Sequence, residues 1–290
     1  MSIGLNSPCK VNLLLNILGR RADGYHELET VMHPVAFCDQ LEFKRAGSGV
    51  DLTCSDAALP VDGRNLVHRA ATAFLQASKI SEGVRIHLEK RIPLAAGLGG
   101  GSGNAATTLL GLNELFGGPL TMEKLHELAA GLGSDINFFL QTGPALATGR
   151  GEKTETLEPF TAMRGAAFLL MHPGFGISTA WAYQNLGRFP QALNGRPGRG
   201  RKLISLLQAG SLAAAGREFY NSLEAPALEK FPLLALFQEW LRENGAAVAL
   251  MSGSGSTTFA IFPKRSGAEI ARENFSKKFG ASNWTAVVEA

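Results

Sequence analysis

The glycine-rich segment LAAGLGGGSGNAA, residues 94–106, limits the possible folds of this chain more than any other feature. It places five of the chain's 34 glycines at positions 97–103, and apolar residues at helical spacing follow it. Because glycine has no Cβ atom, its backbone N–H groups can converge on an anion, and a helix N-terminus adds a partial charge of about +0.5. The segment therefore predicts a phosphate cradle at the start of a helix, with Ser102 and Asn104 placed to cap that helix or to contact a phosphate or its metal.

Two common phosphate-binding motifs describe this segment poorly. The chain contains no GxxxxGK[ST] sequence, which excludes a Walker-type P-loop. Residues 101–106 do match G-x-G-x-x-A, the dinucleotide fingerprint, but the preceding predicted strand ends at residue 89, too early for that motif. The acidic residues about twenty positions further on follow the helix instead of a strand. A nicotinamide-dependent dehydrogenase is therefore disfavoured.

The order of predicted elements indicates an α+β protein with two domains. A length of 290 residues fits two domains, and 45% apolar with 18% charged residues excludes a disordered chain. We place the boundary near residue 160, which gives an N-terminal domain, 1–160, and a C-terminal domain, 161–290. The second domain has the β-α-β-β-α-β order of a ferredoxin-like sheet, with extra helices in the first crossover.

Hydrophobic periodicity and turn residues place the individual elements along the chain. Strands are predicted at 9–18, 28–37, 40–46, 50–54, 84–89, 145–149, 153–158, 166–171, 246–251, 257–262 and 284–288. Helices are predicted at 65–78, 121–131, 178–186, 203–208, 211–222, 231–243 and 266–278, besides the helix that follows the glycines. The Pro-, Gly- and Arg-rich residues 189–201 predict a mobile surface loop.

The first predicted strand, 9–18, carries a cation and two amides among apolar residues. Because side chains alternate along a strand, Lys10 and Asn12 share one face, with Asn16 further along it. A lysine and an asparagine on one face of a buried strand indicate either a functional site or an edge strand with a solvated face.

Charge and cysteine usage bear on the partners and the compartment. A net charge of +3 fits a protein that handles anionic small molecules and disfavours a nucleic-acid binder. The three cysteines form no CxxC pair, which is typical of thiols in a reducing cytosol. The N-terminus has no basic region, and no apolar run approaches the roughly 18 residues of a membrane span. We expect a cytoplasmic monomer or weak homodimer that acts on a small molecule and binds neither nucleic acid nor membranes.

Four segments resemble the motifs of the GHMP kinases. PLAAGLGGGSGNAA resembles their phosphate loop, and MSGSGSTTFAIF resembles their C-terminal glycine motif. The opening SPCKVNLLLNILGRRADGYHELETVMHPV and the central LGSDINFFLQTGPALATGRGE are similar to those of the members that phosphorylate a cytidine-diphosphate-linked methylerythritol, on the non-mevalonate route to isoprenoids. The motifs follow the family order between residues 7 and 262, and the element Gly24-Tyr25-His26 favours this branch.

The resemblance implies both a fold and a reaction. An N-terminal domain like ribosomal protein S5 domain 2 would accompany the ferredoxin-like domain, with ATP and substrate meeting in the cleft between them. The reaction would be direct phosphoryl transfer to the substrate 2-hydroxyl. Lys10 and Asp135 would form the catalytic pair: Asp135 would accept the hydroxyl proton, and Lys10 would keep that carboxylate ionised and offset developing charge. Asn12 would orient the hydroxyl.

The resemblance also implies how the substrate is recognised. Tyr25 and Tyr183 would sandwich the cytosine ring, and His26 would hydrogen-bond its polar edge. Thr179 would lie near the transferred phosphate. Two residues of the C-terminal glycine motif would support the phosphate loop and the substrate end: Gly253 and Ser254.

ATP and Mg²⁺ are the cofactors that the resemblance implies, with Asn65 and Leu66 beside the adenine. Together with Mg²⁺, whose ligands the resemblance leaves open, the glycine-rich segment would hold the phosphates: Pro93, Leu94, Ala95, Ala96, Gly97, Leu98, Gly99, Gly100, Gly101, Ser102, Gly103 and Asn104. The family loop usually has a second serine where this chain has Gly103. That replacement removes a hydroxyl, predicts a more flexible loop and bears on the affinity for ATP.

Two other functions stay open at this point. The first is another GHMP small-molecule kinase, of the mevalonate or homoserine type, in which the Gly-Tyr-His element would be incidental. The second is a non-catalytic regulator of the same fold that binds a nucleotide, against which the presence of Lys10 and Asp135 argues. Taken alone, Asp135 is also compatible with a helix N-cap, because it follows one helix and precedes another.

Overall fold

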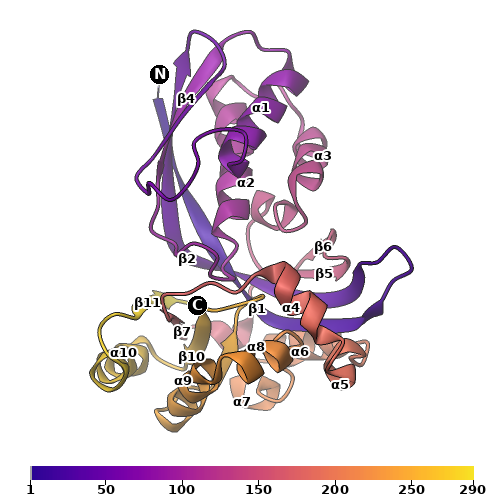
Figure 1. The fold of residues 1–290 in the computed structure, drawn as a ribbon, viewed down its shortest axis with the longest axis vertical. Coiled ribbons are helices and arrows are strands. Elements are labelled where there is room, and N and C mark those ends of the chain that lie inside the picture. Colours follow the sequence, from indigo (N-terminus) through magenta and orange to yellow (C-terminus); the bar gives the residue numbers. More distant parts are fainter. Residues whose placement is uncertain (1) are drawn as a thin grey trace. The chain divides into compact units, whose positions relative to one another are not determined.

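The computed structural model describes residues 2–290 and contains two compact units that interleave along the chain (Figure 1). Unit 1 consists of Met1–Cys9, Phe37–Ile92 and Gly99–Thr142, and unit 2 of Lys10–Ala36, Pro93–Leu98 and Gly143–Ala290. Two long strands cause the interleaving, because β1 (Ser2–Arg20) and β2 (His26–Ala46) contribute residues to both units. A single boundary near residue 160 does not describe these units, and the domains 1–160 and 161–290 stay a prediction.

Unit 1 is a sheet accompanied by helices. The strand order is β3-β4-β2-β1, and β4 (Gly83–Glu89) lies parallel to β3 (Val50–Cys54) and antiparallel to β2. Three helices pack on one another beside these strands (Figure 1): α1 (Leu66–Ser78), α2 (Gly100–Leu115) and α3 (Met122–Leu132). A short 3₁₀ helix, η1 (Asn137–Leu140), contacts α2 and α3.

Polar side chains explain where two of these helices begin. Asn65 accepts a hydrogen bond from the N–H two residues ahead at 2.9 Å, and Thr121 accepts one from three residues ahead at 3.3 Å. Such caps satisfy N–H groups that have no partner within the helix. The helix α2 begins differently, since its N-cap is Gly99 at φ +70° and no side chain caps it. The helices predicted at 65–78 and 121–131, and the helix after the glycines, are confirmed.

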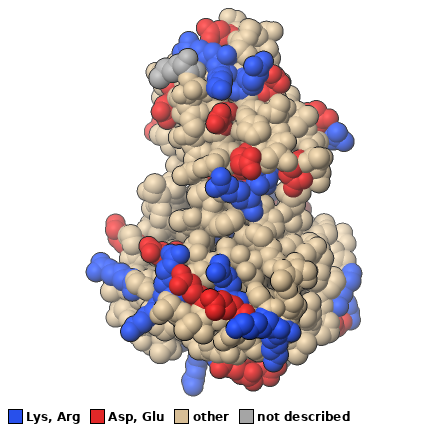
Figure 2. Space-filling view, turned by 90° about the vertical axis from the view of Figure 1, so that its left-hand side faces the viewer, with Lys and Arg blue, Asp and Glu red and all other residues tan. Residues whose placement is uncertain are grey.

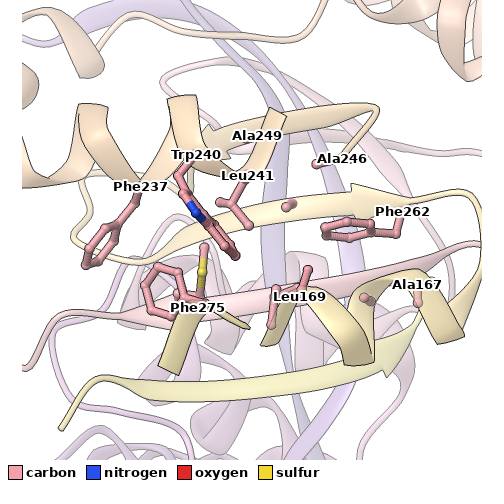
Figure 3. Packing of buried hydrophobic residues seen from close by; sticks show 13 residues of the cluster. Ala167, Leu169, Phe237, Trp240, Leu241, Ala246, Ala249, Phe262 and Phe275 are labelled. Carbon is pink, nitrogen blue, oxygen red and sulfur yellow. The ribbon is translucent and has the colours of Figure 1, made fainter. Parts of the chain in front are cut away.

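Unit 2 contains the expected ferredoxin-like sheet. Its four strands have the order β11-β7-β10-β9, each antiparallel to its neighbours: β7 (Ala167–His172), β9 (Val248–Met251), β10 (Thr258–Phe262) and β11 (Trp284–Glu289). The helices α9 (Pro232–Glu243) and α10 (Arg265–Phe279) share one apolar core with these strands. Figure 3 shows the aromatic rings of this core beside the strands, and complete burial of one such ring contributes about 1.5–3 kcal/mol.

The remaining strands of unit 2 extend the sheet of β1 and β2. β5 (Ala145–Gly149) lies antiparallel to β2, β6 (Lys153–Thr156) antiparallel to β5, and β8 (Tyr220–Asn221) parallel to β1. The other helices are short: η2 (Thr161–Met163), α4 (Thr179–Leu186), α5 (Pro190–Leu193), α6 (Arg199–Gln208), α7 (Leu212–Ala215) and α8 (Glu224–Lys230).

Three expectations about individual elements were wrong. The strands predicted at 28–37 and 40–46 form the single strand β2, because Asp39 is buried and hydrogen-bonded where a break was expected. The helix predicted at 211–222 is only α7, and the strand β8 follows it. The helices α5 and α8 were not predicted, since elements of four and seven residues are too short to show a helical period.

Residues 189–201 are not the irregular loop that their composition predicts. They contain α5 and the start of α6, and buried side chains of β1 and β2 bind them. Glu29 accepts hydrogen bonds from the N–H groups of Gly198 and Gly200 at 3.1 Å each, and Asn16 donates to a carbonyl of the segment at 2.9 Å. The carboxylate also lies at the N-terminus of α6, where negative charge is favoured. These partners are distant in sequence, so composition alone could not indicate them.

Basic and acidic side chains mix at the surface. Figure 2 shows a face on which Lys and Arg lie interspersed with Asp and Glu, in keeping with a net charge of +3. Among residues 2–290, no helix is both long enough and apolar enough to cross a membrane.

Candidate active site

A buried lysine on β1 is the central feature of the site in unit 2. Lys10 is 3% exposed and Asn12 is 4% exposed. The Lys10 Nζ donates to Asn12 Oδ1 at 2.5 Å and to the carbonyl of Gly97 at 3.2 Å, and Asn12 Nδ2 donates to Thr30 Oγ1 at 2.8 Å. The two residues share a face, as the alternation predicted. Because both side chains are almost completely buried, the alternative of an edge strand with a solvated face does not hold.

The C-terminal glycine motif contacts the first half of the glycine-rich segment within unit 2. Ser252 Oγ donates to the carbonyl of Gly97 at 2.9 Å, and the N–H of Thr257 donates to the carbonyl of Ala96 at 3.1 Å. Gly97 has φ +77°, and a Cβ there would lie 2.1 Å from the Ser252 carbonyl oxygen. Only glycine permits this conformation and this close approach.

Gly253 and Ser254 connect this motif to the lysine and to α4. A Cβ at Gly253 would lie 3.3 Å from the Lys10 Nζ and 3.4 Å from Asn12 Oδ1. The hydroxyl oxygens of Ser254 and of Thr179, the first residue of α4, are 2.9 Å apart. Unit 2 therefore gathers five of the predicted site residues: Lys10, Asn12, Thr179, Gly253 and Ser254.

The residues predicted to bind cytosine also lie in unit 2. The ring centroids of His26 and Tyr183 are 5.0 Å apart. Tyr25 is 58% exposed, and the guanidinium carbon of Arg150 lies 4.8 Å from its ring centroid. Burial, together with the charge of Arg20, lowers the pKa of His26 below its ordinary value, so its ring is neutral at pH 7. Arg150 was not predicted, because it stands in a turn whose composition shows no preference for an aromatic partner.

The second half of the glycine-rich segment forms the first turn of α2 in unit 1. The N–H groups at the start of a helix have no carbonyl partner within it, and no side chain caps α2. A Cβ at Gly101 would meet only Leu66 Cδ1, at 3.7 Å, so the space beside this residue is open, whereas a Cβ at Gly100 would lie 3.1 Å from Ile92 Cγ2. Amide donors at the positive end of a helix suit an anionic phosphate.

Gly103 is closely packed, and the loop flexibility expected from it stays a prediction. It is buried within α2, where its N–H donates to the carbonyl of Gly99 at 2.9 Å. A Cβ at Gly103 would lie 2.6 Å from the carbonyl oxygen of Pro8 and 3.2 Å from Ser7 Oγ. Glycine here allows α2 to approach β1 closely, and its effect on ATP affinity stays a prediction.

Two asparagines predicted to bind ATP have protein partners for their side chains. Asn104, 2% exposed, donates from Nδ2 to Ser7 Oγ and to Asp39 Oδ2 at 2.9 Å each. Asn65 caps α1 with Oδ1 and donates from Nδ2 to the carbonyl of Pro60 at 2.7 Å. The roles of both residues toward ATP, and that of Leu66, stay predictions.

Sequence reasoning missed a buried ion pair in unit 1. The side chains of Lys90 and Asp39 are 5% and 0% exposed and form an ion pair. Asp39 also accepts hydrogen bonds from the N–H groups of Arg91 and Ile92 at 2.7 and 2.9 Å. Aspartate between two apolar runs is typical of a turn, and lysine at a strand end is typically exposed. No local signal identified the pair.

Asp135 lies in unit 1, half-buried, in the turn between α3 and η1. The helix η1 begins at Asn137 and its N-cap is Ile136. Asp135 is therefore not the cap of that helix, which removes the structural alternative considered for it. Its role as a base stays a prediction.

Known families and proteins resemble the chain over nearly its whole length. The model of the GHMP kinases N terminal domain matches residues 65–144, and that of the GHMP kinases C terminal domain matches residues 203–281. A 4-diphosphocytidyl-2-C-methyl-D-erythritol kinase of Synechococcus sp. (strain JA-2-3B'a(2-13)) is 42% identical over 284 residues, which cover 95% of this chain and 90% of the relative. A protein of the same name from Syntrophotalea carbinolica is 38% identical over 275 residues, or 94% of each chain.

Solved structures agree with these relatives. A crystal structure of 4-(cytidine 5'-diphospho)-2C-methyl-D-erythritol kinase matches with a TM-score of 0.80 and 33% identity, covering 99% of this chain and 100% of that one. A homoserine kinase from Cytophaga hutchinsonii matches with a TM-score of 0.77 at 20% identity, covering 99% and 94%, which shows the fold alone. The α+β fold of two GHMP kinase domains is confirmed. By these likenesses the chain belongs to the 4-diphosphocytidyl-2-C-methyl-D-erythritol kinase family of the GHMP kinases.

Proposed function

We propose that this chain is an ATP-dependent kinase that phosphorylates the 2-hydroxyl of 4-diphosphocytidyl-2-C-methyl-D-erythritol, called the cytidyl substrate below, in the methylerythritol phosphate pathway. Identities of 42% and 38% to relatives of that name, over nearly the whole chain, carry the proposal. The buried lysine of unit 2 and the uncapped helix N-terminus of unit 1 support it, since they offer the groups that phosphoryl transfer requires.

Recognition of the cytosine would fall to the aromatic residues of unit 2. The edge of cytosine presents an amine donor beside a ring-nitrogen acceptor, and the neutral ring of His26, with one acceptor and one donor nitrogen, would pair with one of these two groups. Tyr183 packs against His26, and its stacking on the cytosine opposite Tyr25 stays a prediction. Arg150 covers one face of Tyr25, so a base would stack on the other face.

Phosphoryl transfer would use the residues around Lys10. The 2-hydroxyl oxygen would attack the γ-phosphorus of ATP, the bond from that phosphorus to the β–γ bridging oxygen would break, and Asp135 would accept the hydroxyl proton. Lys10 would offset the negative charge on the transferred group, and Asn12, which Lys10 already contacts, would orient the hydroxyl. Thr179 and Ser254 would donate hydrogen bonds to the phosphoryl oxygens.

ATP would bind with its phosphates at the first turn of α2. The N–H groups and the positive helix end of that turn, with the open space beside Gly101, fit this ligand. We propose that Mg²⁺ enters as the MgATP complex, because this ion usually keeps several waters and binds through substrate phosphates. Within residues 2–290, no group of three or more His, Cys, Asp or Glu side chains is placed to hold a metal.

A substrate panel tests the proposed function. ADP release with MgATP would be measured for the cytidyl substrate, mevalonate, homoserine and galactose. Turnover of the cytidyl substrate alone is expected. Turnover of another compound of the panel would show a small-molecule kinase but contradict the proposed cytosine site. ATP binding without turnover of any of the four compounds would favour a non-catalytic regulator. Cytoplasmic location, a monomer or weak homodimer, and the absence of nucleic-acid or membrane partners stay predictions.

Variants separate the proposed roles. Asp135→Asn is expected to lower kcat by about 10²–10⁴-fold, the usual contribution of a general base, while the exposed Asp51→Asn leaves it unchanged. Tyr25→Ala is expected to raise KM for the cytidyl substrate without changing KM for ATP, and Tyr25→Phe keeps the stacking face. A Tyr25→Ala variant with unchanged KM for both substrates would contradict the assignment of this residue.

A further inference from the structure

We propose that Asp39 is a positioning residue for ATP: its carboxylate binds both ends of the glycine-rich segment and so holds the first turn of α2 in its binding conformation. This inference rests on the proposed function, because it takes that turn as the phosphate site. Asp39 lies on β2 within unit 1 and its side chain is inaccessible to solvent.

One carboxylate oxygen binds the chain where the segment begins. Asp39 Oδ1 accepts hydrogen bonds from the N–H of Arg91 at 2.7 Å and from the N–H of Ile92 at 2.9 Å. Ile92 is the last residue before Pro93, so these two bonds determine where the backbone leaves the end of β4. An N–H group has one direction of donation, and two successive ones on one oxygen leave this backbone little freedom.

The other oxygen binds the chain where the segment ends. Asp39 Oδ2 accepts from Asn104 Nδ2 at 2.9 Å and pairs with the ammonium of Lys90. Asn104 lies in the second turn of α2, and its Nδ2 also donates to Ser7 Oγ at 2.9 Å. A single buried group therefore connects residue 92 to residue 104, across the whole segment.

The ion pair of Lys90 and Asp39 also sets the charge beside the first turn of α2. A Cβ at Gly100 would lie 3.4 Å from the Lys90 Nζ, so the ammonium lies next to the start of α2. A cation at a helix N-terminus is unfavourable, and the Asp39 carboxylate compensates it. With two backbone N–H groups, one amide and one ammonium, the carboxylate has a donor for each of its lone-pair positions.

Such a connection matters because the segment is costly to order. Five glycines stand at positions 97–103, and glycine loses more conformational freedom than any other residue. Positive φ values at Ala95, Gly97 and Gly99 define one particular path for the backbone. Holding both ends close reduces the number of alternative paths, and a segment already ordered before binding gives up less freedom when ATP arrives.

The variant Asp39→Asn tests the proposal, because an amide has only one oxygen to serve four donors. Binding of MgAMP-PNP, a non-hydrolysable ATP analogue, would be measured by calorimetry on the full chain. If the binding conformation becomes a minor state, the apparent Kd rises by the inverse of its population, and we expect about 10-fold or more. KM for ATP should rise in parallel, while KM for the cytidyl substrate and kcat at saturating ATP stay within about 2-fold. Amide hydrogen exchange at residues 97–103 should become faster.

Two further variants serve as matched controls. Lys90→Met removes the same ion pair but leaves Asp39 with three of its donors, so it should destabilise unit 1 as much while raising the Kd for MgAMP-PNP less than 3-fold or so. Glu42→Gln, exposed on the same strand, should change neither quantity. An equal loss of affinity in Lys90→Met and Asp39→Asn would overturn the proposal, because affinity would then follow stability alone.

The outcomes also separate this inference from the proposed function. A wild-type chain that does not bind MgAMP-PNP contradicts the proposed function. Wild-type binding with an unchanged Kd in Asp39→Asn contradicts only the positioning role. If Asp39→Asn does not fold, Asp39→Glu keeps the charge but displaces the carboxylate by one methylene, and an unchanged Kd in that variant contradicts the proposal equally.

Discussion

Two carboxyl groups hold the chain ahead of the two glycine-rich segments, one in each unit: Asp39, which is buried, and Glu224, which is half-buried. In unit 1, Asp39 accepts hydrogen bonds from the N–H groups of Arg91 and Ile92, directly before Pro93. In unit 2, Glu224 Oε1 accepts the N–H of Met251 at 2.7 Å, directly before the C-terminal glycine motif at 252–257. The same structural task is performed in both places by a carboxyl oxygen and backbone N–H groups.

The two groups differ in their charge environment. Asp39 is paired with the ammonium of Lys90. The hydrogen-bond donors of Glu224 are neutral, namely the Met251 N–H and Gln238 Nε2 at 2.6 Å, and Arg242 acts on it only through its charge. Burial therefore raises the pKa of Glu224 to about 7. The stability of unit 1 should therefore depend on the ammonium of Lys90, and the stability of unit 2 should depend on the protonation of Glu224.

The largest effect is expected on removal of the cation in unit 1. Lys90→Met leaves a buried carboxylate without its counter-charge, and breaking a buried pair in this way costs about 3–5 kcal/mol of unfolding free energy. The matched change in unit 2, Arg242→Met, removes hydrogen bonds to Gln238 Oε1 and to the carbonyl of Ala249 and should cost about 1–2 kcal/mol. Urea unfolding of both variants measures the difference. Equal losses would mean that the two carboxyl groups do not differ as described.

The next effect is the pH dependence of unit 2. The pKa of Glu224 is about 7 in the folded chain, above its ordinary value of 4.5, so the contribution of this group to stability is complete below about pH 4.5 and is lost as the pH rises through 7. Between pH 5 and 8 the unfolding free energy should fall by about 2–3 kcal/mol from this group alone. Glu224→Gln keeps an oxygen acceptor without the titration, so the stability difference between wild type and variant should vary with pH by that amount. A constant difference across this range would contradict the raised pKa.

Much of this molecule could be predicted from the sequence, because the signals involved are local. Helix caps such as Asn65 and the alternation that places Lys10 beside Asn12 depend on neighbouring residues, and the ferredoxin-like pattern follows from the order of strands and helices along the chain. The motifs also predicted the family. The buried connections could not be predicted, because Asp39 and Lys90 are 51 positions apart and each resembles a surface residue in its own segment.

The close packing of Gly103 could not be predicted for the same reason. Without a Cβ, Gly103 reads as a source of flexibility, yet in the structure it permits contact with Pro8, far away in the sequence. The same holds for residues 189–201, whose turn-forming composition says nothing of Glu29, the residue that binds them. Local patterns indicate which backbone conformations are available, and only tertiary contacts decide which of them is used.

Two glycines of α2 in unit 1, Gly103 and Gly101, differ in how closely other atoms approach them. Gly103→Ala would place a Cβ 2.6 Å from a backbone oxygen of β1, and such overpacking costs about 1–3 kcal/mol. Gly101→Ala, in the same helix with nothing closer than 3.7 Å, should instead gain about 0.5–1 kcal/mol through helix propensity. Thermal unfolding of the two variants measures whether each change lowers or raises the stability. Stabilisation by Gly103→Ala would show that glycine at this position serves no close approach.

The smallest change in unfolding free energy is expected for two buried serines, one beside each half of the glycine-rich segment. Ser7 accepts a hydrogen bond from Asn104 Nδ2, whereas Ser252 donates one to the carbonyl of Gly97, which also accepts from the Lys10 Nζ. Ser7→Ala would leave one buried N–H of Asn104 without an acceptor and should cost about 1–2 kcal/mol; Ser252→Ala leaves that carbonyl with a donor and should cost about 0.5 kcal/mol. Each change removes one oxygen from a fully buried residue, so the free energies of unfolding are directly comparable. A larger loss of unfolding free energy in Ser252→Ala than in Ser7→Ala would mean that the Lys10 ammonium does not satisfy the Gly97 carbonyl. The first half of the glycine-rich segment would then depend on Ser252 for its position.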